Sequence, residues 1–245
     1  NLKILDLSHC HLEDSVLARV LNSLQGHPTL RDVDISFNNC HSEACLSIGA
    51  LLRTTHLASL KMTQQFIGRQ KFLDISSIAD SLAGNQTLRV LDLKENFISS
   101  DHLEKLFAIL TQNRTLQTLD ISCTDISDES LVRLADKLDS THIESLNLLH
   151  NPFKNAEPLV LAAKKNHRLR RILVDPSVHA RGSLWYQTAL NNAGRHLLTH
   201  NRIPVSLWPL LLENASNIQS PEDLDFQTHD IMYYLLNGPV LLSAH

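Results

Sequence analysis

Four carboxylates stand at one repeating position in the sequence, and carboxylates placed in pairs can perform general acid–base catalysis. Each follows the pattern L-x-x-[LV] and precedes Leu or Ile; the four are Asp6, Asp34, Asp92 and Asp120. A catalytic pair needs two different environments that separate the pKa values of its members. Because these aspartates share one local context, we interpret them as ionised, solvent-facing groups and not as catalysts.

Histidines offer a second set of reactive groups. His196 and His200 are four residues apart on a predicted helix, a spacing that can place two imidazoles on one metal ion. No Glu stands between them and the sequence indicates no third ligand, so we predict no metal site there. His9 and His11 flank Cys10 at a predicted turn, and we interpret them as solvent-facing histidines beside a structural cysteine.

Other signatures of catalysis and cofactor binding are missing from the sequence. It contains no G-x-x-x-x-G-K-[ST], G-x-G-x-x-G, G-x-S-x-G or H-E-x-x-H pattern, and its seven glycines are too few to favour phosphate-binding loops. The four cysteines lack C-x-x-C spacing and are few for a disulfide scaffold. We therefore predict no enzyme, no cofactor and no metal, in a cytoplasmic or alternatively nuclear protein with reduced thiols.

The composition is that of a folded chain with no general affinity for polyanions. Of 245 residues, 43% are hydrophobic, and the formal net charge is −4. No apolar run approaches the roughly 18 residues of a membrane span, so we predict no membrane insertion. The basic cluster at 164–171 (KKNHRLRR) lacks the interleaved aromatic residues of nucleic-acid surfaces, and we interpret it as a solvated turn. Sequons at Asn85, Asn113 and Asn214 would matter only in a secreted protein.

A repeat explains the spacing of the aspartates. The segment LRVLDLKENFI at 88–98 has related copies 26 to 31 residues apart. The others start at residues 2, 30, 57, 116, 143 and 169. These copies resemble leucine-rich repeats of the ribonuclease-inhibitor-like subtype, a group that includes the sensor regions of NOD-like receptors and Ran GTPase-activating proteins. The resemblance implies an α/β horseshoe solenoid over residues 1–180, with a parallel inner sheet, outer helices and about seven repeats. We expect it to be truncated at its N-terminus.

Strand alternation assigns each residue of a repeat to a face. In LRVLDL (88–93) the side chains of Leu91 and Leu93 point to the core, while Asp92 and Lys94 point outward. The consensus asparagine, as at Asn96, is expected to bond to turn backbone that has no ladder partner. Its other occurrences are Asn38 and Asn151. We expect Cys10 in the asparagine slot and Cys40 in an apolar slot to be structural.

Helical patterns alternate with the strands. Residues 101–113 carry one apolar stripe at i, i+3, i+4 and i+7 spacing, and Ser127 is a predicted N-cap for the next helix. Each strand–helix unit buries its apolar side only against its neighbours, so stacking creates one continuous core. The long third step contains 66–74 (FIGRQKFLD), which we interpret as a length variation.

The repeat pattern fails after Ser177, and we predict an α-helical C-terminal cap over residues 181–245. An open solenoid end would expose core and sheet edge, so a cap is physically required. The predicted cap helices are 184–198, 205–215 and 229–239. The tail, including NNAGR at 191–195, resembles tails on leucine-rich-repeat proteins of diatoms and related microalgae, which implies a lineage more than an activity.

The sequence thus predicts a non-catalytic protein–protein interaction module that binds through its concave sheet face. Acidic residues dominate that face, so we expect a partner protein with a basic region and no nucleic acid. The predicted surface comprises Asp6, Asp32, Asp34, Phe37, Lys61, Asp92, Lys94, Glu95, Asp120, Asn147 and Arg171. Two alternatives are a regulator of a small GTPase and the ligand-sensing region of a larger receptor-like protein.

Overall fold

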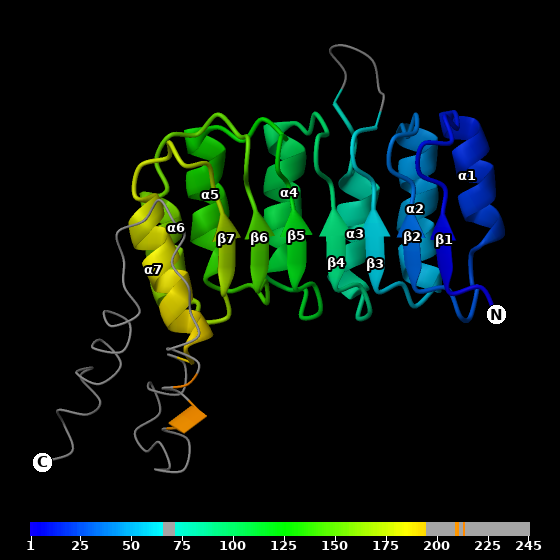
Figure 1. The fold of residues 1–245 in the computed structure, drawn as a ribbon. Coiled ribbons are helices and arrows are strands. Elements are labelled where there is room, and N and C mark those ends of the chain that lie inside the picture. Colours follow the sequence, from blue (N-terminus) through cyan, green and yellow to red (C-terminus); the bar gives the residue numbers. More distant parts are fainter. Residues whose placement is uncertain (66–71, 195–208, 211–212, 214–245) are drawn as a thin grey trace, which may run out of the picture.

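A computed structural model of the chain describes residues 1–65, 72–194, 209–210 and 213. Within these residues, seven parallel strands form one sheet in sequential order (Figure 1). The strands are β1 (Ile4–Asp6), β2 (Asp32–Asp34), β3 (Ser59–Lys61), β4 (Val90–Asp92), β5 (Thr118–Asp120), β6 (Ser145–Asn147) and β7 (Arg171–Leu173).

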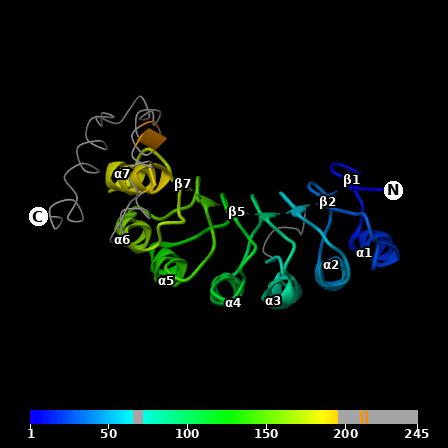
Figure 2. The same ribbon diagram turned by 90° about the horizontal axis from the view of Figure 1, so that it is seen from below.

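Helices alternate with the strands and cover one face of the sheet. They are α1 (Asp14–Ser23), α2 (Ser42–Thr54), α3 (Ser76–Gly84), α4 (Ser100–Leu110), α5 (Asp128–Leu138), α6 (Glu157–Lys165) and α7 (Arg181–Asn192). Seen along the strands, the helices form the outer arc and the strands the inner one (Figure 2). The other sheet face is bare in the described part of the chain and forms the concave side. The predicted solenoid of inner strands and outer helices is confirmed.

A spine of leucines between sheet and helices is the core. Leu91 and Leu93 are fully buried, whereas Asp92 between them is only half-buried, as strand alternation predicts. The predicted helical stripe of α4 is also buried, through residues such as Leu106 and Phe107. The predicted cap at Ser127 is present, with its Oγ accepting the Ser130 N–H at 3.2 Å.

The consensus asparagines form a buried ladder. The Oδ1 of Asn96 accepts the N–H of Gln65 at 2.9 Å, and its Nδ2 donates to the carbonyls of Met62 and Leu93 at 2.7 and 2.9 Å. Asn38 and Asn151 repeat this arrangement, so the predicted role is confirmed. Cys40 is fully buried as expected. Cys10 is exposed, and its Sγ lies 3.5 Å from the carbonyl oxygen of Ser8.

A second asparagine ladder runs along the helix C-termini, and the sequence reasoning missed it. Asn113 is buried, and its Nδ2 donates to the carbonyls of Leu82 and Asn85 at 2.7 and 3.1 Å. Asn85, Asn166 and Asn191 occupy equivalent places. Because both side chains are buried and a glycan would replace one hydrogen of each Nδ2, the fold is incompatible with glycosylation of the sequons at Asn85 and Asn113. The sequon at Asn214 lies outside the described residues.

The described part of the predicted cap is α7. This helix packs against α6 and β7, and Asn191 donates to the carbonyls of Ala163 and Leu169 at 3.1 and 2.7 Å. The second asparagine ladder therefore continues into α7. Of the predicted cap helix 205–215 only residues 209, 210 and 213 are described, and the predicted helix 229–239 and the pair His196 and His200 lie outside the described residues. Residues 66–71 of the long third step lie outside the described residues as well.

Close packing of α2 on α3 depends on Gly49. A Cβ at this position would lie 2.8 Å from the Ser77 carbonyl oxygen and closer still to its hydroxyl. We expect Gly49→Ala to lower the free energy of unfolding by about 1–3 kcal/mol, the usual cost of overpacking. Gly84→Ala is the matched control, because a Cβ there meets nothing within 4 Å. It should be neutral or stabilising by up to about 1 kcal/mol. Urea unfolding followed by circular dichroism measures both, and equal effects would contradict this packing.

Candidate partner-binding surface

Strand register aligns the recurring aspartates in one row across the concave face. The Cα partners along this row are Asp6, Asp34, Lys61, Asp92, Asp120, Asn147 and Leu173. We call the four aspartates of this set the acidic row; Lys61 interrupts it on β3. The structure therefore brings six of the predicted surface residues together at the carboxyl ends of neighbouring strands.

Each aspartate of the acidic row supports its own turn. The Oδ1 of Asp92 accepts the N–H of Lys94 at 2.9 Å, and the other three aspartates accept the equivalent N–H at 2.9 to 3.0 Å. This N–H needs a side-chain acceptor because the sheet ladder uses its neighbours, Leu93 and Glu95, which donate to the next repeat. One carboxylate oxygen is therefore part of the scaffold. The second oxygen of Asp120 accepts a hydrogen bond from the Nδ2 of Asn147 at 2.7 Å, and that of Asp34 lies 3.9 Å from the Nζ of Lys61.

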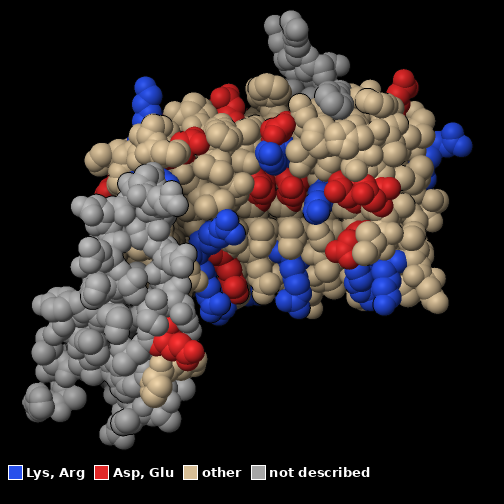
Figure 3. Space-filling model, in the orientation of Figure 1, with Lys and Arg blue, Asp and Glu red and all other residues tan. Residues whose placement is uncertain are grey.

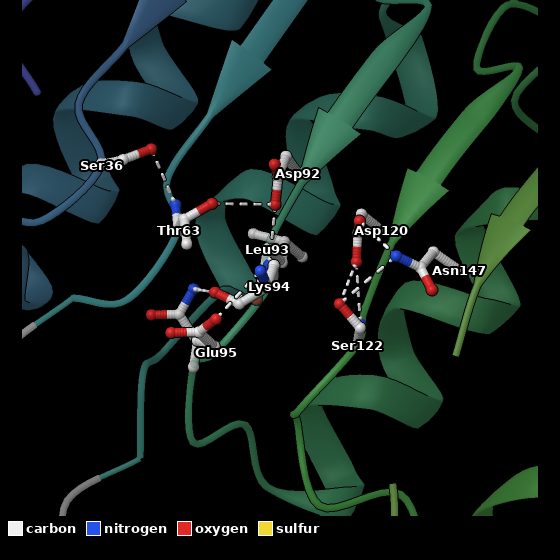
Figure 4. Close-up of polar contacts among 10 residues, drawn as sticks. Ser36, Thr63, Asp92, Leu93, Lys94, Glu95, Asp120, Ser122 and Asn147 are labelled. Carbon is white, nitrogen blue, oxygen red and sulfur yellow. Dashed lines mark hydrogen bonds and ion pairs between the residues drawn. The ribbon is translucent and has the colours of Figure 1, made fainter. Parts of the chain in front are cut away.

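The exceptions in the row show that the turn needs an acceptor but not a charge. Asn147 uses its Oδ1 to accept the N–H of Leu149 at 3.2 Å. Lys61 cannot accept, and the N–H of Thr63 instead donates to the Ser36 hydroxyl of the preceding repeat at 3.1 Å (Figure 4). An Asp→Asn substitution in the row should therefore keep the turn while removing the charge.

Asp92 and Asp6 have pKa values shifted in opposite directions. Burial, reinforced by the nearby negative charge of Asp120, raises the pKa of Asp92 above the usual aspartate value. Hydrogen bonds from the hydroxyl and backbone N–H of Ser8 lower the pKa of the exposed Asp6. Ionisation of Asp92 is therefore less favourable in the free folded protein than in an unfolded chain. A cationic group of a partner beside Asp92 would make its ionised form more favourable.

This difference predicts stability changes of opposite sign. Because the folded-state pKa of Asp92 is raised, its contribution to stability falls as pH rises from the unfolded pKa through the folded one. Asp92→Asn should therefore raise the free energy of unfolding at pH 7, and the gain should vanish near pH 3. Asp6→Asn should lower it at pH 7, because a lowered pKa stabilises the fold above the unfolded pKa. Urea titrations at pH 3, 5 and 7 test both; shifts of the same sign would contradict the assignment.

Two other predicted residues lie on a separate row, two residues before the acidic row along each strand. Asp32 is on β2 and Arg171 on β7, aligned through Ile4, Ser59, Val90, Thr118 and Ser145. We call this the middle row. From β3 to β6 its side chains are small and carry no charge. Arg171 lies at the β7 end of the middle row.

Phe37 and Glu95 belong to a third row, at the turn beyond the strands. Every residue at this slot from β1 to β6 has a positive φ between 47° and 59° although none is glycine. The set is His9, Phe37, Gln64, Glu95, Cys123 and His150. The rings of His9 and Phe37 stack with centroids 3.9 Å apart, and Lys94 pairs with Glu95 at 3.0 Å. Such strained positions at an exposed rim often carry recognition side chains.

A basic edge opposes the acidic row, and the sequence reasoning missed it. The second residue of the repeat is Lys or Arg in four of the seven copies: Lys3, Arg31, Arg89 and Arg170. We call these four residues the basic edge, since they precede the strands. Figure 3 shows blue side chains along the lower rim of this face and a red band across its middle. The recurring L-[KR] pair was the available signal.

The chemistry of the described surface is that of recognition by charge. No group of three or more His, Cys, Asp or Glu side chains in the described residues could hold a metal ion. A hollow of about 500 Å³ between α1 and α2 has Arg19 and Glu43 as its only charged lining residues. None of the helices that the structure describes has the length and apolar composition to cross a membrane.

Comparison with known families and structures identifies the repeat. A family model described as "Leucine Rich Repeat" matches residues 1–24, and one described as "Leucine Rich repeat" matches residues 112–135. The chain contains leucine-rich repeats. Among solved structures, leiomodin-1 actin-binding site 2 is similar, with a TM-score of 0.51 and 10% sequence identity. The match covers 57% of this chain and 83% of that chain, and it shows a shared leucine-rich-repeat fold. No curated protein matches the sequence.

Proposed function

We propose that this leucine-rich-repeat chain is a protein-interaction module whose concave face binds a partner with a basic region. The observation that carries the proposal is the acidic row, in which strand register aligns four aspartates from different repeats on one face of the sheet. Leucine-rich repeats commonly serve protein binding, and a solved chain of similar fold is named for binding actin. Neither matching family model describes an enzyme.

Binding would rest on rigid presentation of charge. The aspartates are fixed by their own turns, so little side-chain entropy is lost when a partner docks. Opposite charge on the partner would accelerate encounter and make association sensitive to salt. Seven strands at about 4.8 Å spacing give a face about 30 Å across, enough for a standard interface of roughly 800 Å² per partner.

The same proposal includes a repeat subtype, a domain boundary and a location, all inferred from the sequence. We assign the repeats to the ribonuclease-inhibitor-like subtype and the tail to the microalgal type. We place the boundary between repeats and cap near residue 180, and the protein in the cytoplasm. The helical half of the repeats, from 9 residues in α3 to 13 in α2, supports the subtype.

Affinity enrichment with a matched pair of variants tests the proposed face. The triple variant Asp34→Asn, Asp92→Asn, Asp120→Asn removes charge while keeping the turn acceptors. The control, Asp101→Asn, Asp136→Asn, Asp139→Asn, removes the same charge from exposed residues on the helix side. Immobilised wild-type and control proteins should enrich the same partners from extracts of cells that produce the protein, and the triple variant should lose them. Enrichment of one identical set on all three would refute the concave-face proposal.

A further inference from the structure

The basic edge, the middle row and the acidic row run parallel across the concave face, and together they define the shape and charge of a binding partner that fits there. The basic edge and the acidic row are separated by three residues along each strand, at most about 10 Å. Between them lies the middle row, which is small and uncharged at Ser59, Val90, Thr118 and Ser145 and carries Ile4 and Asp32 on β1 and β2. An α-helix with its side chains is about 10–12 Å wide. A single helix lying over the middle row would therefore reach both charged rows.

The spacing along the rows also favours a helix over an extended segment. Neighbouring strands are about 4.7–4.9 Å apart, whereas a helix advances 5.4 Å per turn. The mismatch of about 0.6 Å per strand reaches only about 2.4 Å after four steps, which long basic side chains can absorb. In an extended segment, side chains on one face recur about every 6.6 Å, so the register is lost by the third strand.

The charge order specifies a pattern for this helix. From β1 to β5 the acidic row, with Lys61 at its interruption, reads Asp6, Asp34, Lys61, Asp92 and Asp120. A complementary stripe has basic residues on turns one, two, four and five and an acidic residue on turn three. A second stripe, about a quarter turn away, should be acidic opposite Lys3, Arg31 and Arg89. The order of charges along the acidic row is the same in both directions. The basic edge, whose order is not symmetric, therefore determines the direction of the helix.

We propose that the occupant of the concave face is one amphipathic α-helix of a partner protein, laid across the strands with a basic stripe on the acidic row and an acidic stripe on the basic edge. This inference rests on the proposed function and specifies its partner class. Helix-in-groove docking of this kind is read by side chains at i, i+3, i+4 and i+7, one turn for each strand.

Synthetic peptides test the inference directly. The first is a fluorescent helical peptide of about 18 residues, five turns long, with the stripe pattern above. The second has the same composition with the charges permuted between the stripes, and the third carries prolines at two central positions. Fluorescence anisotropy with the full chain should show the patterned peptide binding at least about tenfold more tightly than either control. Equal affinity for the permuted peptide, or for the proline peptide, would overturn the helix inference.

A charge exchange at Lys61 provides a residue-level test. Lys61→Asp restores the aspartate that other repeats hold at this slot, and Lys61 is exposed, so the variant is expected to fold. It should weaken the patterned peptide about five- to tenfold and strengthen, by a similar factor, a peptide with Arg on turn three. If Lys61→Asp does not reverse the preference between the two peptides, the proposed alignment of helix turn three with β3 is overturned. If the triple asparagine variant still loses the natural partner while the peptides show no preference, the proposed function stands and only the helix inference fails.

Discussion

Asn96→Ala is expected to lower the free energy of unfolding by about 3–5 kcal/mol. The side chain makes four hydrogen bonds inside the solenoid, and its loss leaves the N–H of Gln65 and the carbonyls of Met62 and Leu93 without these buried partners. Each unsatisfied buried group costs about 1–3 kcal/mol. Because the bonds join two repeats, the substitution should also weaken the coupling between them. Urea unfolding followed by circular dichroism measures the change.

Asn22→Ala is the matched control for this prediction. Asn22 is exposed on α1 and accepts one hydrogen bond from the side chain of Gln25. An exposed substitution of this kind usually changes stability by less than about 0.5 kcal/mol. A loss below about 1 kcal/mol for Asn96→Ala, or losses of equal size for both variants, would show that the asparagine ladder does not hold the repeats together.

The triple substitution of Asp34, Asp92 and Asp120 by Asn is expected to weaken partner binding by about 10- to 100-fold. Three partly exposed charge pairs at about 0.5–1 kcal/mol each account for this range. Folding should be retained, because Asn147 already performs the turn role with an amide. Isothermal titration calorimetry with the purified partner measures the dissociation constant. The control variant at Asp101, Asp136 and Asp139 should bind as the wild type does.

Local periodicity predicted much of this architecture from sequence. The burial of Leu91 and Leu93 and the amide role of Asn96 follow from a short motif and from backbone groups that need partners. Both signals lie within about ten residues of chain. The cap at Ser127 is local in the same sense.

Contacts between repeats were not predictable in the same way. Asp14 begins α1, yet its carboxylate accepts the N–H groups of His41 and Ala44 at the start of the next helix, at 2.7 and 3.0 Å. The partner lies about 30 residues away, so a local capping rule does not find it. Asn113 was predicted only as a sequon: its Oδ1 accepts the nearby N–H groups of Thr115 and Leu116, but the carbonyls to which its Nδ2 donates lie on the preceding repeat.

The candidate surface was predicted as a set but not as an arrangement. Period-two alternation placed Asp34 and Arg171 outward, and only strand register assigns them to two different rows. The basic edge escaped notice because Arg31 and Arg89 precede the strands, where alternation does not assign a face. The left-handed turn at Phe37 carries no glycine in the sequence to mark it.

The most direct test of the central claim is the salt dependence of the association rate constant with the purified partner, measured by stopped-flow fluorescence for wild type and for the triple asparagine variant. If the acidic row steers a basic partner, the wild-type rate constant should fall steeply between low and physiological salt, and the variant should associate more slowly with a flatter dependence. Identical rate constants and slopes for the two proteins would contradict the claim that the acidic row is the recognition surface.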